Sequence, residues 1–232
     1  MRDAQCARRV AGKRCWLLVA HCSLLIANPL ESRCVLAYVA APTWEIRLFP
    51  ALAVWTPEDG LLGALAPLGL ALAAGDAVVV DLDPLGPRYP GDRSLADLVQ
   101  DGLRRNDLTP RRGVGVLRNG GVAPLEAKSV VEALLSHLPR VVLRLPPRPA
   151  PGALPIPVVP VRLLIPGELF SRSTGPAVFQ ATPGFAPIPG IGVRLPVPDP
   201  ATVRGLIEGR RPPRKDRWIR AWRSAWRLPW PQ

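Results

Sequence analysis

The sequence predicts an α/β fold, namely an open, mostly parallel β-sheet with helices on both of its faces. Between residues 48 and 149, short apolar runs alternate with segments that carry helix signals. The apolar runs are continuous, which is typical of strands buried on both faces in a parallel sheet. A strand, a helix and a second strand fit within residues 53–87, the length of one βαβ unit. We therefore expect right-handed crossovers and an open sheet.

The first three elements follow from local signals. Residues 48–57 are apolar and end in Thr-Pro, which predicts a buried strand stopped by a turn. Residues 58–75 begin with acidic side chains and end at a glycine, so a helix is expected there, starting late or kinked at Pro67. Residues 76–84 read Asp-Ala-Val-Val-Val-Asp-Leu-Asp-Pro and predict a second buried strand.

The later elements continue the alternation. Ser94 is followed three residues later by Asp97, which predicts a capping box at the start of a helix over 94–106. The remaining segments predict strands over 113–121, 140–149, 155–166 and 176–184, and a helix over 124–138. Sixteen of the 30 prolines lie between Pro139 and Pro200, so long helices and central strands are not expected to dominate that region.

Charge divides the chain into three parts. Residues 1–47 hold seven Lys/Arg and three Asp/Glu (+4), and residues 201–232 hold nine and two (+7). The total is +12, so residues 48–200 contribute only +1. We therefore predict a non-core N-terminal extension over 1–47, an α/β domain over 48–208, and a basic, Trp-rich tail over 209–232. Basic ends point to an anionic partner.

All four cysteines, Cys6, Cys15, Cys22 and Cys34, lie in the predicted extension. Their spacings do not match a zinc site, even with His21 beside Cys22, so unpaired thiols are expected and no metal ion. Basic residues followed by the apolar run 15–27 resemble a signal peptide. That run is interrupted by His21 and is too short to span a bilayer. The protein is therefore expected in the cytoplasm, peripherally at the inner face of the membrane.

The stretch GDAVVVDLDPLGP, residues 75–87, resembles the second strand of the ParA/MinD family of P-loop ATPases. In that family a strand, a phosphate-binding loop rich in Gly and Lys, and a helix precede a strand ending in Val-Asp-Leu-Asp-Pro. Residues 53–87 follow this order. Residues 94–103 resemble the family's next helix, and residues 140–147 resemble a later strand that ends in Asp-Thr-Pro-Pro. The resemblance covers residues 50–165 and implies a P-loop-like α/β fold.

The chain departs from that family where nucleotide would bind. The loop and helix start at 56–65 keep Gly60 and Gly63, but they contain no Lys, and Ala64 occupies the place of the Mg²⁺-binding Ser or Thr. Two acidic residues, Glu58 and Asp59, stand where phosphates would bind and would repel them. In the later strand, the family's Asp before Pro-Pro is replaced by Arg144.

Asp81 and Asp83 remain from the motif. In the resembling family the carboxylate at the position of Asp83 lies near the hydrolytic water. Without the Lys and the Mg²⁺ ligands it has little to act on, so caps and loop hydrogen bonds at a strand end are the simpler role. We expect a pseudo-ATPase with no catalytic residue and no cofactor. The histidines, His21 and His137, and the serines show no catalytic setting.

The tail RWIRAWRSAWRLPWPQ, residues 217–232, has amphipathic helical spacing. On a helix, one side is aromatic and aliphatic and the other is almost entirely Arg, and Pro229 ends the pattern. Trp favours membrane interfaces and Arg favours anionic lipid. MinD-like proteins also carry a C-terminal amphipathic membrane helix. The expected membrane- or nucleic-acid-binding residues are Trp218, Ile219, Arg220, Trp222, Arg223, Trp226, Arg227 and Trp230.

Four interpretations of the tail remain open: packing of the Trp side on the core, membrane docking, contact with nucleic acid, and binding to a protein. The function expected is that of a non-catalytic ParA/MinD-like adaptor on an anionic membrane surface or on a ParA/MinD-type ATPase. The alternatives are a nucleic-acid-binding accessory protein and a divergent active ATPase. No small-molecule substrate is indicated.

Overall fold

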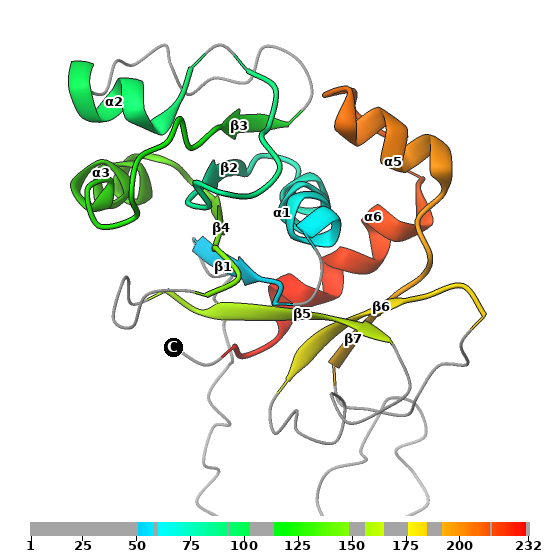
Figure 1. Ribbon diagram of the computed structural model, residues 1–232. Coiled ribbons are helices and arrows are strands. Elements are labelled where there is room, and N and C mark those ends of the chain that lie inside the picture. Colours follow the sequence, from blue (N-terminus) through cyan, green and yellow to red (C-terminus); the bar gives the residue numbers. More distant parts are fainter. Residues whose placement is uncertain are drawn as a thin grey trace, which may run out of the picture. The chain divides into compact units, whose positions relative to one another are not determined.

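A seven-stranded, all-parallel sheet runs through the domain in the order β3-β2-β4-β1-β5-β6-β7 (Figure 1). The computed structural model describes residues 51–57, 60–91, 93–102, 114–148, 156–164, 176–184, 192–213 and 215–230. All of these belong to one unit of the chain, residues 44–232. The strands are β1 (Ala51–Trp55), β2 (Val78–Asp81), β3 (Gly115–Leu117), β4 (Val141–Arg144), β5 (Val158–Leu164), β6 (Ala177–Ala181) and β7 (Gly192–Leu195). The predicted open parallel α/β fold is confirmed.

Helices cover both faces of this sheet, as Figure 1 shows. The helices are α1 (Gly60–Ala74), α2 (Leu95–Asp101), α3 (Lys128–His137), α5 (Pro200–Ile207) and α6 (Arg217–Ala221), which continues into the 3₁₀ helix η1 (Trp222–Arg227). Helices α2 and α3 pack on one face, and α1, α5, α6 and η1 pack on the other. None of the helices in the described ranges is both long and apolar enough to cross a bilayer.

Two hydrophobic cores lie on the two faces because successive strand side chains point in opposite directions. In β1, Leu52 and Val54 pack toward α1, whereas Ala51 and Ala53 pack toward the α2 and α3 side. All four are buried. Burial on both sides is the reason why these strands read as continuous apolar runs rather than as alternating ones.

A local signal placed the start of α2 correctly, although this helix ends at Asp101 rather than at residue 106. The Ser94 hydroxyl accepts a hydrogen bond from the Asp97 amide at 3.2 Å, and the Asp97 carboxylate accepts one from the Ser94 amide at 2.7 Å. This is the predicted capping box, and it satisfies two N–H groups at the start of α2. Helix α1 begins at Gly60 and continues through Pro67, so it does not start late at the proline.

The proline-rich region between residues 139 and 200 contains more β-strand than its composition predicted. Strand β5 contains Pro160 and yet lies between β1 and β6. The proline is tolerated because β5 pairs with β6 only from Val161 onward. Strand β7 and helix α5 were not predicted. Helix α5 had a signal, since Asp199 caps it by accepting from the Ala201 amide at 2.7 Å and Pro200 is its first residue.

Candidate functional site

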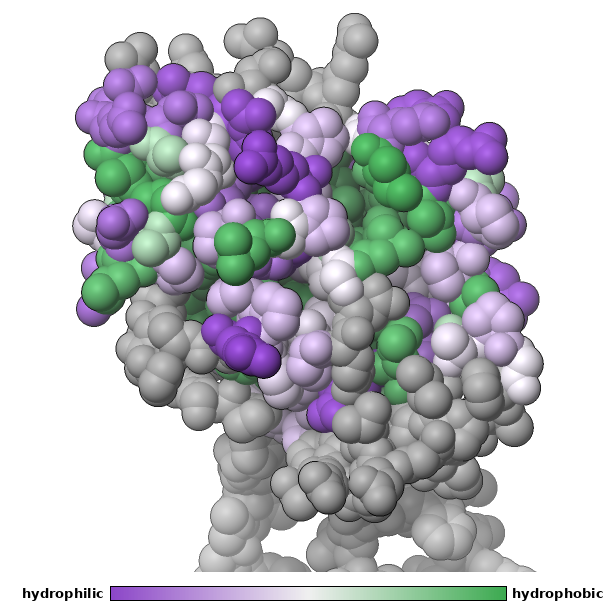
Figure 2. Space-filling view, in the orientation of Figure 1, coloured by the Kyte–Doolittle hydropathy of each residue, from purple (hydrophilic) through white to green (hydrophobic). Residues whose placement is uncertain are grey.

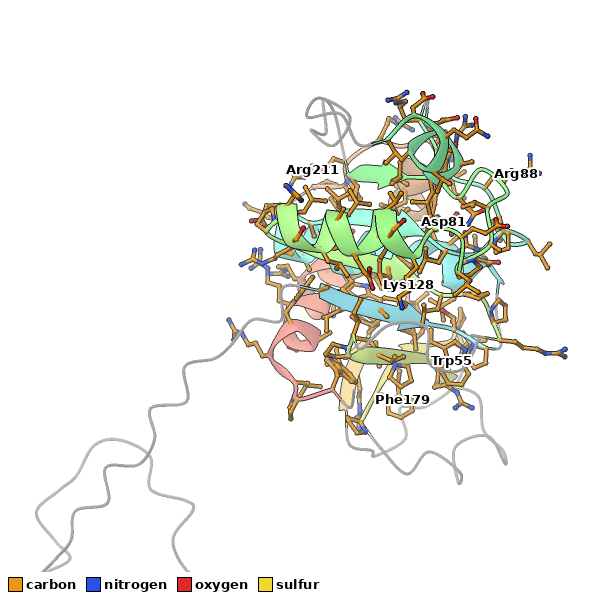
Figure 3. All side chains as sticks on the ribbon, turned by 90° about the vertical axis from the view of Figure 1, so that its left-hand side faces the viewer. Trp55, Asp81, Arg88, Lys128, Phe179 and Arg211 are labelled. Atoms are coloured by element: carbon orange, nitrogen blue, oxygen red, sulfur yellow. The ribbon has the colours of Figure 1, made fainter. Side chains whose placement is uncertain are left out.

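The carboxyl ends of β2 and β4 meet at one edge of the sheet. The two strands are neighbours, and their register sets Asp81 beside Arg144. Strand β1, which precedes the expected phosphate loop, lies on the other side of β4. The topology therefore brings together Asp81, Asp83 and Arg144, three of the predicted site residues. Figure 3 shows Asp81 and Arg88 toward this end of the strands and Arg211 toward the opposite end.

Arg144 binds both aspartates inside the protein. Its Nη2 lies 2.9 Å from Oδ2 of Asp83, and its Nη1 lies 3.4 Å from Oδ2 of Asp81. The Nη1 group also donates to the carbonyl of Pro87 at 2.7 Å. The exposed fractions of Asp81, Asp83 and Arg144 are only 2%, 5% and 1%. The cluster is a buried, charge-assisted network in which each carboxylate has a cationic partner.

The second oxygen of Asp83 shapes the loop after β2. Oδ1 accepts hydrogen bonds from the amides of Leu85 at 3.1 Å and Gly86 at 3.0 Å. A Cβ atom on Gly86 would overlap Nη2 of Arg144 and Oδ2 of Asp83. Only glycine leaves room for the ion pair at this position. The loop bonds expected for Asp83 at a strand end are therefore present.

Tyr89 closes the loop over the first half of α1. Its hydroxyl donates to the carbonyl of Ala64 at 2.6 Å, and its ring centroid is 5.3 Å from Cζ of Arg144. This geometry is a cation–π contact inside the core. Burial raises the pKa of Tyr89 far above its usual range, so the hydroxyl stays protonated. Sequence reasoning missed Tyr89, because its partners come from α1 and β4.

Asp81 has a strongly perturbed pKa. Burial raises the pKa of this carboxyl to about 6, against the opposing effect of the Arg144 guanidinium, which lowers it. Its backbone carbonyl accepts a hydrogen bond from Nδ2 of Asn119 at 3.2 Å. Asn119 also donates to the Val122 carbonyl at 3.0 Å. Asn119 was another residue that the sequence did not assign, and it lies in the segment predicted as a strand over 113–121.

The two glycines of the expected phosphate loop lie at the start of α1. Gly60 is its first residue, and Gly63 follows one turn later. A Cβ atom on Gly63 would lie 3.6 Å from Oγ1 of Thr56, an ordinary contact. The acidic residues Glu58 and Asp59, and the histidine and cysteines of the predicted extension, lie outside the described residues.

The chemistry of this cluster is that of an ion pair rather than of a metal site. Both carboxylates are withdrawn from water and engaged by the same guanidinium. A carboxylate in that state is not free to hold Mg²⁺ or to orient a water molecule, which phosphoryl transfer requires. In the described part of the chain, no group of three or more His, Cys, Asp or Glu side chains is placed to hold a metal ion.

The four tryptophans of the tail lie in the core. The exposed fractions of Trp218, Trp222, Trp226 and Trp230 range from 0% to 4%. Nε1 of Trp218 donates to Oε1 of Gln180 at 2.7 Å, and Nε1 of Trp226 donates to the carbonyl of Leu70 at 2.9 Å. Ile219 is buried with them. Of the four interpretations of the tail, packing on the core is therefore the one observed for its aromatic side. That side is covered by α1 and the sheet.

The arginine side of the same segment faces solvent. Arg217, Arg220, Arg223 and Arg227 are all exposed. Only this half of the predicted binding surface is accessible while the tail stays packed. Binding to a membrane, to nucleic acid or to a protein therefore remains a prediction for the arginines, and for the tryptophans it would require the segment to leave the core.

Comparisons with known proteins do not assign the chain to a family. No known protein family matches the chain, and no curated protein matches it significantly. The open parallel α/β architecture therefore rests on the observed sheet topology. The likeness to ParA/MinD proteins rests on the motifs in residues 50–165.

Proposed function

We propose that the protein is a non-catalytic adaptor with a ParA/MinD-like architecture, that is, a pseudo-ATPase that acts by binding. One observation carries the proposal: Arg144, in the place of the family's catalytic-strand aspartate, is paired with both Asp81 and Asp83. The two acidic residues that survive from the motif are thereby used for structure.

The arrangement of elements supports the ParA/MinD-like part of the proposal. Strand β1, helix α1 and strand β2 follow one another as in the resemblance, and β4 lies next to β2. The substitution by Arg144 is compensated, because its guanidinium takes the two aspartates as partners and Tyr89 covers it. Removing one partner of a buried ion pair is strongly destabilising, so this compensation keeps the charged cluster compatible with the fold.

The carboxyl edge offers a surface for a protein partner such as a ParA/MinD-type ATPase. Leu85 and Leu125, on the loops after β2 and β3, are 94% and 81% exposed, and Leu61 at the start of α1 is 50% exposed. Large apolar side chains in water are typical of contact surfaces when they gather on one side. Figure 2 shows hydrophobic patches among polar side chains on the side of the molecule that Figure 1 presents.

Nucleotide binding is the decisive test. Thermal unfolding of the full chain is measured with and without excess ATP and Mg²⁺, and we expect no shift in Tm, because a ligand raises Tm only when it binds the folded state. The matched variant is Asp83→Asn, which keeps the side-chain size. A nucleotide-dependent rise in Tm, or phosphate release that this variant abolishes, would establish a divergent ATPase and overturn the proposal.

A second candidate is a nucleic-acid-binding accessory protein. The observation that favours it is the exposed row of arginines on α6 and η1, which remains accessible although the tryptophans are buried. An anionic membrane surface would be bound by the same arginines through charge alone. Nucleic acid and an anionic membrane differ in which other side chains, besides arginine, they require on the binding surface.

A further inference from the structure

We propose that the arginines of α6 and η1 bind the phosphate backbone of double-stranded nucleic acid without reading its sequence. The inference rests on the second candidate function, a nucleic-acid-binding accessory protein, and names the form of nucleic acid that is bound. The binding surface, here called the arginine row, consists of Arg217, Arg220, Arg223 and Arg227.

The arginine row lies on one side of a continuous helical segment. Its members are three or four residues apart, the spacing that sets side chains on one side of a helix. With a rise of about 1.5 Å per residue in α6 and about 2.0 Å in the 3₁₀ helix η1, the row is about 17 Å long. Lys215 and Arg211 are also exposed and extend the positive charge toward α5.

The row is held in place by the packing of its opposite side. Trp218, Trp222 and Trp226 are buried against α1, and Asp216 caps α6 by accepting from the Ile219 amide at 2.9 Å. The other carboxylate oxygen of Asp216 accepts from the Thr202 hydroxyl at 2.5 Å, which joins α6 to α5. A partner would therefore meet a preformed helix, and no backbone ordering would oppose binding.

The charge of the row is not neutralised within the described residues. None of its four arginines forms an ion pair there, whereas Arg210 pairs with Glu208 and Arg140 pairs with Asp76. The nearest acid along the chain, Asp216, is already engaged in capping. Residues 201–232 hold nine basic and two acidic residues, a net charge of +7. A strongly anionic partner is complementary to this surface.

The burial of the tryptophans decides among anionic partners. Binding to single strands relies on aromatic rings that stack on bases, and stable interfacial helices insert apolar side chains into lipid. The aromatic and aliphatic side of this segment is in the core and can do neither. Guanidinium groups alone suffice for a duplex, where they contact phosphates and release counterions. The row therefore fits a duplex better than a single strand or a bilayer.

The test uses fluorescence anisotropy of the full chain with a labelled DNA duplex over a series of salt concentrations. We expect binding at low salt and a slope of log K against log[salt] of about −3 to −4, because each neutralised phosphate contributes about −0.9. The triple variant R220Q/R223Q/R227Q should bind at least about tenfold more weakly and flatten the slope by about 2 to 3. All three side chains are exposed, so the variant should unfold at the wild-type temperature.

A charge-matched control removes three exposed cations elsewhere, in R88Q/R148Q/K128Q. We expect this control to bind like the wild type. No duplex binding at low salt, equal weakening by both triple variants, or tighter binding to a single strand would overturn the proposal. Pelleting with phosphatidylcholine vesicles containing phosphatidylglycerol, if it depended on the arginine row and duplex binding were absent, would replace it with membrane docking. None of these outcomes alters the nucleotide test, so the two proposals fail separately.

Discussion

Nη2 of Arg144 on β4 lies 2.9 Å from Oδ2 of Asp83, which follows β2, and both side chains are closed off from water. A charge in such a place is tolerated only while its partner remains. The pair therefore links strand β4 to the loop that follows β2. In the proposed pseudo-ATPase, this pairing would give the two aspartates of the motif a structural role.

Removing the guanidinium should destabilise the fold strongly. Arg144→Met leaves two buried carboxylates without a counter-charge, and we expect a loss of about 3–5 kcal/mol in the free energy of unfolding. Urea denaturation measures it. Arg148→Met, at an exposed position a few residues away, is the control and should change stability by less than about 0.5 kcal/mol. Adding Asp81→Asn and Asp83→Asn to Arg144→Met should recover part of the loss, and further destabilisation would contradict the ion-pair account.

Stability should depend on the ionisation of Asp81. Burial raises its folded-state pKa to about 6, above the ordinary value of 3.8. The folded protein therefore holds this proton more tightly than the unfolded chain, so this contribution to stability is full below about pH 4 and is lost as pH rises to about 6. The wild type minus Asp81→Asn difference in unfolding free energy should fall by on the order of 3 kcal/mol across that range. A difference that grows with pH would mean that attraction by Arg144 outweighs burial.

The tail should be part of the folded core rather than an appendage. Trp222 is fully buried and meets the ring of Trp218 edge to face, with 5.7 Å between ring centroids. Trp222→Ala should cost about 3–5 kcal/mol, because it leaves a large cavity between α1 and η1. The neighbouring exposed Arg223→Ala should cost less than about 0.5 kcal/mol. Equal, small effects in thermal and urea unfolding would show that the tail is detached in solution.

Substitution by alanine should destabilise the protein at Gly69 of α1 and stabilise it at Gly63 of the same helix. A Cβ atom on Gly69 would approach the ring of Trp218 to 2.6 Å, so Gly69→Ala should destabilise by about 1–3 kcal/mol through overpacking. A Cβ atom on Gly63 would have only an ordinary contact with Thr56, at 3.6 Å. Gly63→Ala should therefore stabilise the helix by about 0.5–1 kcal/mol. Thermal melts of the two variants compare the predictions directly, and destabilisation by both would contradict them.

Much of the fold could be predicted because its signals are local. The apolar runs at β1, β2 and β4, and the capping box at Ser94, act over a few residues and need no partner elsewhere. The three charged site residues were also identified from motif positions. Their pairing was not, because Arg144 meets Asp83 only when β2 and β4 become neighbours. Helix α5 had a local signal in Asp-Pro that was overlooked.

The amino-acid sequence by itself determined that the last helix has one aromatic side and one arginine side. Helical spacing guarantees this division whatever surrounds the segment. Only the tertiary structure decided that the aromatic side is buried and the arginine side is exposed. Gly69 on α1 leaves room for Trp218 and Trp222, and Gln180 on β6 accepts the hydrogen bond of Trp218. These partners are far away in the chain, and burying the rings beside them leaves the arginines as the surface that meets water.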